Sequence, residues 1–114
     1  MIHVVHIDDR LPRRARRFLV ERLWPKRIAR KDLEPVTWCK DATPTHDLLR
    51  WYGNKLERWM EFQADFEEQL LGNPRAWEPI LDAAREEDIV LVHAARDKDY
   101  CPAQALADFL RSRL

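Results

Sequence analysis

Ile89-Val90-Leu91-Val92 is an uninterrupted run of apolar residues near the end of the chain. Such a run is typical of a strand that is buried on both faces, as the strands of a parallel sheet are. Three earlier segments are also predicted to be strands, residues 2–7, 18–20 and 35–39. Because helical patterns alternate with these segments, the sequence predicts one small α/β domain over residues 1–114, with a largely parallel sheet of about four strands flanked by helices.

The apolar periodicity in the second half of the chain predicts three helices. Residues 57–71 carry large apolar side chains at spacings of three and four, namely Trp59, Phe62, Phe66 and Leu70. Gly72-Asn73-Pro74 is expected to end this helix. We expect the next helix to have Pro79 at its first position, which suits proline, and to run to about residue 87. A final helix is expected over residues 102–114.

Length and composition indicate a single core and no membrane span. At 114 residues, with 46% hydrophobic residues, the chain can bury one core without disulfides. Its only cysteines are Cys39 and Cys101, and no apolar run approaches the roughly 20 residues that a membrane span needs. The first residues include His3 and His6 and lead directly into acids, unlike a signal peptide. We therefore expect a cytoplasmic protein with free thiols.

The net charge is zero, but the charges are unevenly distributed. Residues 10–31 contain ten lysines and arginines and a single acid, Glu21, whereas residues 57–88 contain ten acids and three arginines. Two interpretations are open: the two stretches keep the monomer in solution or attract each other, or residues 10–31 form a nucleic-acid surface. Zero net charge favours the first, because nucleic-acid-binding domains usually carry an overall basic excess.

Four of the five tryptophans alternate with single cations in the middle of the chain. Large rings lower the local dielectric constant, and cations supply charge and hydrogen-bond donors. The pattern therefore predicts a cleft that accepts an anion. The predicted ligand-binding residues are Arg22, Trp24, Lys40, Arg50 and Arg58.

These residues also have a purely structural interpretation. The four cations could instead form partly buried ion pairs with acids elsewhere in the chain, namely Glu21, Asp41, Asp47 and Asp97. Trp38, Trp51 and Trp59 could fill the core. Trp24, which precedes Pro25 at the end of a strand, is the best candidate for the wall of a pocket, because ligands of α/β proteins usually bind at strand ends.

Two residues near the last predicted helix are candidates for catalysis. Cys101 precedes Pro102 at a helix N-terminus, where the helix dipole and Arg96 are expected to lower the pKa of the thiol. The C-x5-R loop of cysteine phosphatases is absent, however, because the sixth residue after Cys101 is Ala107. Asp97 is a candidate for orienting an arginine or acting as a base. These residues do not decide whether the protein is an enzyme.

Metal ions and nucleotide cofactors are not expected. The four histidines, at positions 3, 6, 46 and 93, lack metal-ligand spacing relative to one another and to the cysteines. The chain contains only two glycines, which excludes glycine-rich phosphate loops of the dinucleotide-binding or P-loop kind. The predicted anion would therefore be held by side chains.

Five segments match a known family in order and spacing. They read Val20-Glu21-Arg22-Leu23-Trp24-Pro25, Trp38-Cys39-Lys40-Asp41, Leu49-Arg50-Trp51-Tyr52-Gly53, Arg58-Trp59-Met60-Glu61-Phe62 and Ile89-Val90-Leu91-Val92-His93-Ala94-Ala95-Arg96-Asp97. With these segments the chain resembles the bacterial domain-of-unknown-function 488 family, in its YeaO-like branch. The resemblance implies a compact α/β domain from a bacterium, and it implies no particular reaction.

The chain departs from the family pattern at several polar positions. Glu21 stands where the family has Asp, Arg27 where it has Gly, Asn54 where it has His, and Phe66 where it has Tyr. The wider family opens its last helix with Cys-His-Arg, and Cys101-Pro102-Ala103 keeps only the thiol of that triplet. Each departure removes or moves a polar group that a shared chemistry would use.

The leading interpretation is a small protein that binds a phosphate- or carboxylate-bearing ligand in a cleft lined by Arg, Lys and Trp, with or without catalysis. One alternative is a nucleic-acid-associated protein that uses residues 10–31. The other is a protein-interaction module that presents the acidic helix at residues 57–71 to a partner. The sequence leaves the identity of the ligand and the oligomeric state open.

Overall fold

A four-stranded parallel sheet forms the centre of the computed structural model, which describes residues 1–114. Its strands are β1 (Ile2–His6), β2 (Arg16–Leu19), β3 (Thr37–Trp38) and β4 (Ile89–His93). They lie in the order β1-β4-β2-β3, and every neighbouring pair is parallel. The last strand in the sequence thus lies between the first two, and the predicted parallel α/β fold is confirmed.

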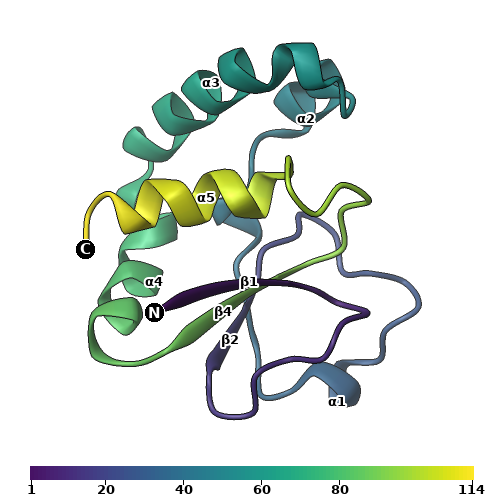
Figure 1. Cartoon of the computed structure of the whole chain (residues 1–114), viewed down its shortest axis with the longest axis vertical. Coiled ribbons are helices and arrows are strands. Elements are labelled where there is room, and N and C mark those ends of the chain that lie inside the picture. The colour runs from purple at the N-terminus through teal and green to yellow at the C-terminus, as the bar shows by residue number, and fades with distance from the viewer.

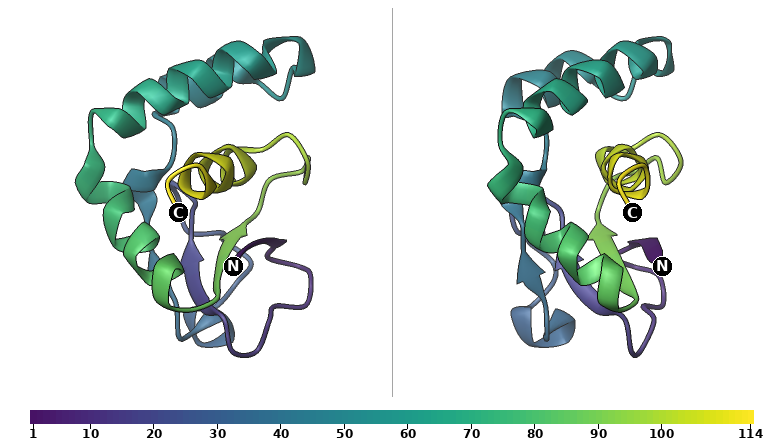
Figure 2. Two further views of the ribbon diagram at one scale, coloured as in Figure 1. Left: turned by 60° about the vertical axis from the view of Figure 1, so that its left-hand side comes forward. Right: turned by 90° about the vertical axis from the view of Figure 1, so that its left-hand side faces the viewer.

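Five helices accompany the sheet, together with the two 3-10 turns η1 (Lys40–Ala42) and η2 (Leu56–Arg58). The helices are α1 (Arg30–Leu33), α2 (His46–Tyr52), α3 (Trp59–Leu71), α4 (Pro74–Glu86) and α5 (Pro102–Arg111). α5 packs against β1 and β4, and α3 lies farther from the sheet, on the other side of α5 (Figure 1). α4 packs against η1, close to the β3 edge of the sheet (Figure 2). None of the helices has the length and apolar character that crossing a membrane requires.

The core is divided between the two faces of the sheet. On the helix-covered face, Ile89 and Leu91 of β4 join Phe18 of β2 in a large cluster with residues of α3, α4 and α5. On the opposite face, Val90 and Val92 join a smaller cluster that loops and α1 cover. Every residue of β4 is consequently buried, which explains the continuous apolar run that predicted this strand.

The prediction that a helix begins at Pro79 is wrong. α4 begins at Pro74, and Pro79 lies inside it. Proline suits the first helical position because its fixed φ angle matches a helix and its missing N–H would have no helical partner there. The Asn73-Pro74 pair therefore separates α3 from α4, and α4 then continues through Pro79. Burial of the apolar face of α4, including Trp77 and Ile80, offsets the loss of the backbone hydrogen bond that Pro79 cannot make.

Candidate functional site

Two of the predicted ligand-binding cations are engaged with the backbone. The Nε atom of Arg22 donates to the carbonyl oxygen of Pro44 at 3.0 Å, and its Nη2 atom donates to that of Thr43 at 3.4 Å. Arg58 donates to the carbonyl oxygen of Trp51 and lies over the ring of the same residue, 5.0 Å from its centroid. Both guanidinium groups therefore brace the chain around α2.

The other predicted ligand-binding residues lie elsewhere. The Lys40 ammonium group lies 5.1 Å from the centre of the Trp38 ring, and Arg50 is exposed on the last turn of α2. Trp24 packs edge-on against Trp38 and donates its indole N–H to the carbonyl oxygen of Ile28 at 2.7 Å. No cavity is lined by two of the four predicted cations. Their joint role in binding an anion stays a prediction.

The alternative prediction, that these cations pair with particular acids, is wrong. None of the four acids proposed for that role, Glu21, Asp41, Asp47 and Asp97, forms an ion pair. Backbone carbonyls and aromatic rings take the place of these acids. The prediction that three tryptophans fill the core agrees with their packing. Trp51 and Trp59 are half-buried against the large helix-side cluster, and Trp38 is half-buried against the smaller cluster.

Three cations do come together in a cleft at the β3 edge of the sheet, here called the edge cleft. It has a volume of about 300 Å³, and its cations are Arg16, Lys40 and Arg75. Trp38 contributes to its wall, and Asp41 is its only acid. This volume is at the lower end of the range for small-molecule sites. The edge cleft is therefore cationic, and Lys40 is the only one of the five predicted ligand-binding residues that lines it.

Each cation of the edge cleft comes from a different element. Arg16 is the first residue of β2 and lies over Phe18, two residues farther along the same face of the strand, at 5.0 Å. Lys40 opens η1 two residues after β3 ends, and Arg75 is the second residue of α4. Sequence reasoning missed Arg75 because it placed the start of the helix five residues too late. Pro74 was the signal that could have located this residue.

The electrostatic balance of the edge cleft favours an anion. Arg16 approaches a carboxylate only at Glu87, 3.9 Å away, and both side chains of that pair are about half exposed. Such a pair contributes little, because water screens it. The Cys39 thiol also lines the cleft, and burial raises its pKa to about 11 despite the nearby Arg16. This thiol is therefore neutral near pH 7 and cancels none of the positive charge.

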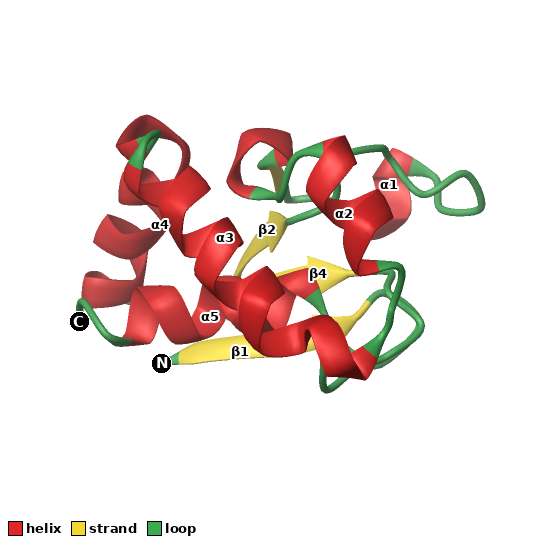
Figure 3. Cartoon of the chain, turned by 90° about the horizontal axis from the view of Figure 1, so that it is seen from above, coloured by secondary structure: helices red, strands yellow, loops and turns green.

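A second polar cluster lies where β1 and β4 end. The strands point the same way and the long loops lie beyond their ends (Figure 3). The rings of His6 and His93 meet edge to face at 5.3 Å. Their Nδ1 atoms accept the backbone N–H groups of Asp8 at 3.1 Å and Ala95 at 3.2 Å, respectively. A neutral imidazole bonded in this way carries its proton on Nε2, so both rings present a donor rather than a metal-binding lone pair.

Glu21 joins the ends of three strands beside this cluster. Its carboxylate accepts the backbone N–H of Ala94 at 3.0 Å, and its carbonyl oxygen accepts the indole N–H of Trp38 at 2.7 Å. Burial raises the pKa of the Glu21 carboxyl. Ligands of open α/β sheets usually bind at the carboxyl ends of the strands, where the chain connections diverge. Between β2 and β4, this position is occupied by the Glu21 side chain itself.

The two catalytic candidates occupy structural positions. Cys101 is 1% exposed, and its Sγ atom is 3.9 Å from the carbonyl oxygen of Lys98. Burial raises the pKa of this thiol, so the expected lowering by the helix dipole and Arg96 is wrong. The Asp97 carboxylate accepts the backbone N–H groups of Asp99 and Tyr100, both at 2.9 Å. It stabilises the turn that leads into α5.

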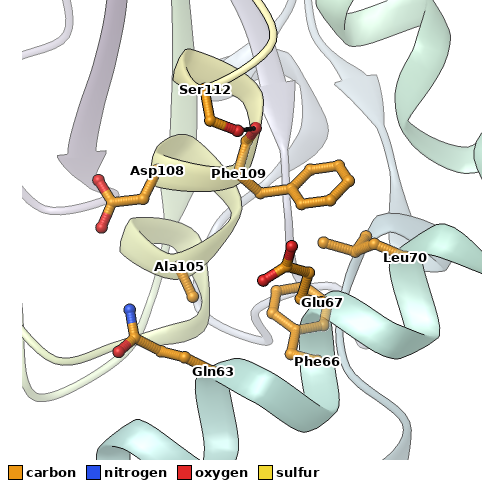
Figure 4. A pocket seen from close by; sticks show the side chains of 8 residues that line it. All are labelled: Gln63, Phe66, Glu67, Leu70, Ala105, Asp108, Phe109 and Ser112. Atoms are coloured by element: carbon orange, nitrogen blue, oxygen red, sulfur yellow. Dashed lines mark hydrogen bonds between the residues drawn. The ribbon is translucent and has the colours of Figure 1, made fainter.

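A further cavity of about 250 Å³ lies between α3 and α5 (Figure 4). Its floor is apolar and includes Phe66 and Phe109. Glu67 and Asp108 lie at its rim, and no cation lines it. This cavity would repel an anion, so it is a poorer candidate than the edge cleft for the predicted ligand.

Comparison with known families tests the resemblance that the five sequence segments suggested. The model of a family described as the inactive DUF488-N3 subclade matches residues 1–114. The chain belongs to this family. The match spans the entire described fold, and it confirms the resemblance that rested on the five sequence segments.

Relatives of this DUF488-N3 chain occur in several bacteria. The uncharacterised protein YeaO of Escherichia coli K12 is 29% identical over 96 residues, which cover 84% of each chain. The uncharacterised proteins Rv3073c of Mycobacterium tuberculosis H37Rv and Mb3100c of Mycobacterium bovis are each 38% identical over 63 residues, or 55% of this chain and 53% of theirs. No solved structure matches the chain. The relatives thus support the family and name no activity.

Proposed function

We propose that this protein binds a small phosphate- or carboxylate-bearing ligand in the edge cleft without transforming it. The observation that carries the proposal is the convergence of Arg16, Lys40 and Arg75 on one cavity that contains a single acid. Guanidinium groups bind phosphate and carboxylate oxygens through paired hydrogen bonds, and an ammonium group adds a point charge. Apolar lining residues, including Phe18, Pro79 and Ile80, provide a partly dry wall, which strengthens those contacts.

The absence of catalysis rests on the state of the candidate groups. A thiol nucleophile has to be a thiolate, whereas burial raises the pKa of both Cys39 and Cys101. The Asp97 carboxylate already accepts two backbone N–H groups and is poorly placed to act as a base. The description of the family as inactive agrees with this assignment. Both thiols are free, in keeping with the proposed cytoplasmic location.

Calorimetric or NMR titration with inorganic phosphate and acetate tests the proposal. Arg75→Ala and Lys40→Ala should each weaken binding about tenfold, since a hydrogen bond to a charged group contributes about 1.5–3 kcal/mol. Arg50→Ala is the matched control, because it removes an exposed cation from α2 that lines no cavity. Binding by this variant should equal that of the wild type.

The same titration separates the edge cleft from the site first predicted from the sequence. Loss of binding in Arg50→Ala or Arg58→Ala, with Arg75→Ala unaffected, would move the site to the cations around α2. Equal weakening by all variants would indicate nonspecific attraction. Absence of binding by the wild type at millimolar anion would rule out the proposal.

A further inference from the structure

A second basic cavity adjoins the edge cleft across the short strand β3. It has a volume of about 220 Å³, and three arginines, Arg13, Arg16 and Arg17, line it without any acid. Arg16 and Thr37 line both cavities, so the two are neighbours at the β3 edge of the sheet. We call this second space the arginine cavity. Together the two cavities present five cations and one acid.

Most of this positive charge is not neutralised within the chain. Among the five cations, only Arg16 lies within 4.0 Å of a carboxylate, that of Glu87 at 3.9 Å. Arg17 donates one guanidinium N–H to the carbonyl oxygen of Leu33 at 2.8 Å, which fixes its position without removing its charge. Most of the charge of these five cations is therefore available to a ligand, although the chain as a whole is neutral.

We propose that the two cavities bind consecutive phosphates of a single-stranded nucleic acid along the β3 edge. The inference rests on the proposed anion site and identifies its ligand as part of a polyanion. A monophosphate needs only the edge cleft, whereas an adjoining cavity with three arginines and no acid fits a second phosphate. Trp38 is the aromatic residue of β3, and its half-buried ring lies at the same edge of the sheet, where an unpaired base would stack on it.

The shape of the surface favours a single strand over a duplex. β3 contains two residues, so the basic strip is short, and single-stranded sites of only a few nucleotides are common. Proteins that recognise bases in the major groove of a duplex usually insert a helix there. The basic residues 10–31 instead lie in loops, in β2 and in the four-residue α1. Stacking on a side chain also needs a base that is free of its partner strand.

Fluorescence anisotropy with a labelled oligo(dT) of about ten nucleotides tests the inference, beside titrations with thymidine monophosphate and tripolyphosphate. The wild type should bind the oligonucleotide at least about tenfold more tightly than the monophosphate. The logarithm of the binding constant should fall with the logarithm of salt concentration with a slope of about −1.4, as expected for two phosphates of a single strand.

Three arginine variants locate the two phosphate positions. Arg75→Ala, in the edge cleft, should weaken both the monophosphate and the oligonucleotide about tenfold. Arg13→Ala, in the arginine cavity, should weaken the oligonucleotide about fivefold and leave the monophosphate unchanged. Arg14→Ala is the control, because Arg14 is exposed in the same stretch and lines neither cavity.

The outcomes separate this inference from the proposed function. If the monophosphate and the oligonucleotide bind equally tightly, or if Arg13→Ala has no effect, the single-strand inference is wrong while the anion site stands. If tripolyphosphate competes as well as the oligonucleotide, the ligand is a general polyanion and the inference is also wrong. A preference for duplex DNA would overturn it as well. Failure of every anion to bind would refute both proposals.

Discussion

At the scale of single residues, arginines in this protein hold loops as well as carry charge. Arg17, Arg22, Arg58 and Arg111 all donate side-chain N–H groups to backbone carbonyls of other segments. The planar guanidinium group can direct several donors at fixed angles, which lysine cannot do. The acceptors of these four side chains lie in the last turns of α1 and α2, at the start of β1 and in the segment before α2, so these arginines tie the ends of elements as well as a loop.

Arg22 is the clearest case, and replacing it should reduce stability. Arg22→Lys and Arg22→Ala should each lower the free energy of unfolding by about 1–3 kcal/mol, because the buried Thr43 and Pro44 lose the donor to their carbonyls. Urea unfolding measures the change. Arg50→Ala, a control at an exposed position, should stay within about 0.5 kcal/mol of the wild type. Full stability in Arg22→Lys would show that charge alone suffices.

Both thiols should react slowly while the protein is folded. Burial raises the pKa of Cys39 to about 11 and also raises that of Cys101, so the thiolate fraction at neutral pH is minimal. Iodoacetamide labelling followed by mass spectrometry at pH 7 should show slow modification of both residues. Unfolding in guanidinium should release both for rapid reaction. Rapid labelling of Cys101 below neutral pH would instead identify a thiol nucleophile.

At the scale of elements, α4 contains a local conflict between sequence and structure. Proline in a helix interior removes a backbone hydrogen bond, and its ring crowds the carbonyl four residues earlier, here that of Arg75. The helix forms because its packing compensates, with Trp77, Ile80 and Leu81 buried against the core. Pro79 itself is exposed and lines the edge cleft next to Arg75.

Replacing this proline should make the protein more stable. Pro79→Ala restores an N–H donor and relieves the crowding, and we expect a gain of about 1–3 kcal/mol in the free energy of unfolding. Thermal and urea unfolding measure the gain. Pro74→Ala is the comparison, because proline at the first helical position costs no hydrogen bond and its loss should bring no such gain. A loss of stability in Pro79→Ala would show that the ring makes packing contacts that matter more.

At the scale of the whole molecule, folding stability should depend on His93. This residue is 2% exposed, and burial, together with His6 and Lys98, lowers its pKa from 6.5 to about 4, against an opposing effect of Asp9. Between these values the unfolded chain binds a proton at His93 and the folded protein does not. Stability is therefore complete above about pH 6.5 and falls as the pH decreases toward 4, by at most about 3 kcal/mol.

Unfolding measured across this pH range, in the wild type and in His93→Asn, checks the effect. Asparagine can still accept the Ala95 N–H, but it does not titrate. The difference in stability between the two proteins should therefore shrink as the pH falls from 6.5 to 4. A difference that stays constant over this range would show that His93 titrates normally in the folded state.

The sequence by itself determined the sheet and the family. A strand buried on both faces needs consecutive apolar residues. The run Ile89-Val90-Leu91-Val92 therefore predicts a central strand of a parallel sheet. The periodicity of residues 57–71 likewise predicts α3, since Phe62, Phe66 and Leu70 are buried on one stripe. The interleaved cations and tryptophans also predict a cationic cleft, but of the five predicted ligand-binding residues only Lys40 lines the edge cleft.

Only the tertiary structure decided which cations share a cavity. Arg16 and Arg75 are far apart in the sequence and meet Lys40 because the start of β2 and the first turn of α4 both lie beside the β3 edge. Arg22 and Arg58, by contrast, turn to backbone carbonyls that no local pattern identifies. Local periodicity reports which face of an element is buried, whereas the meeting of side chains depends on how the elements pack.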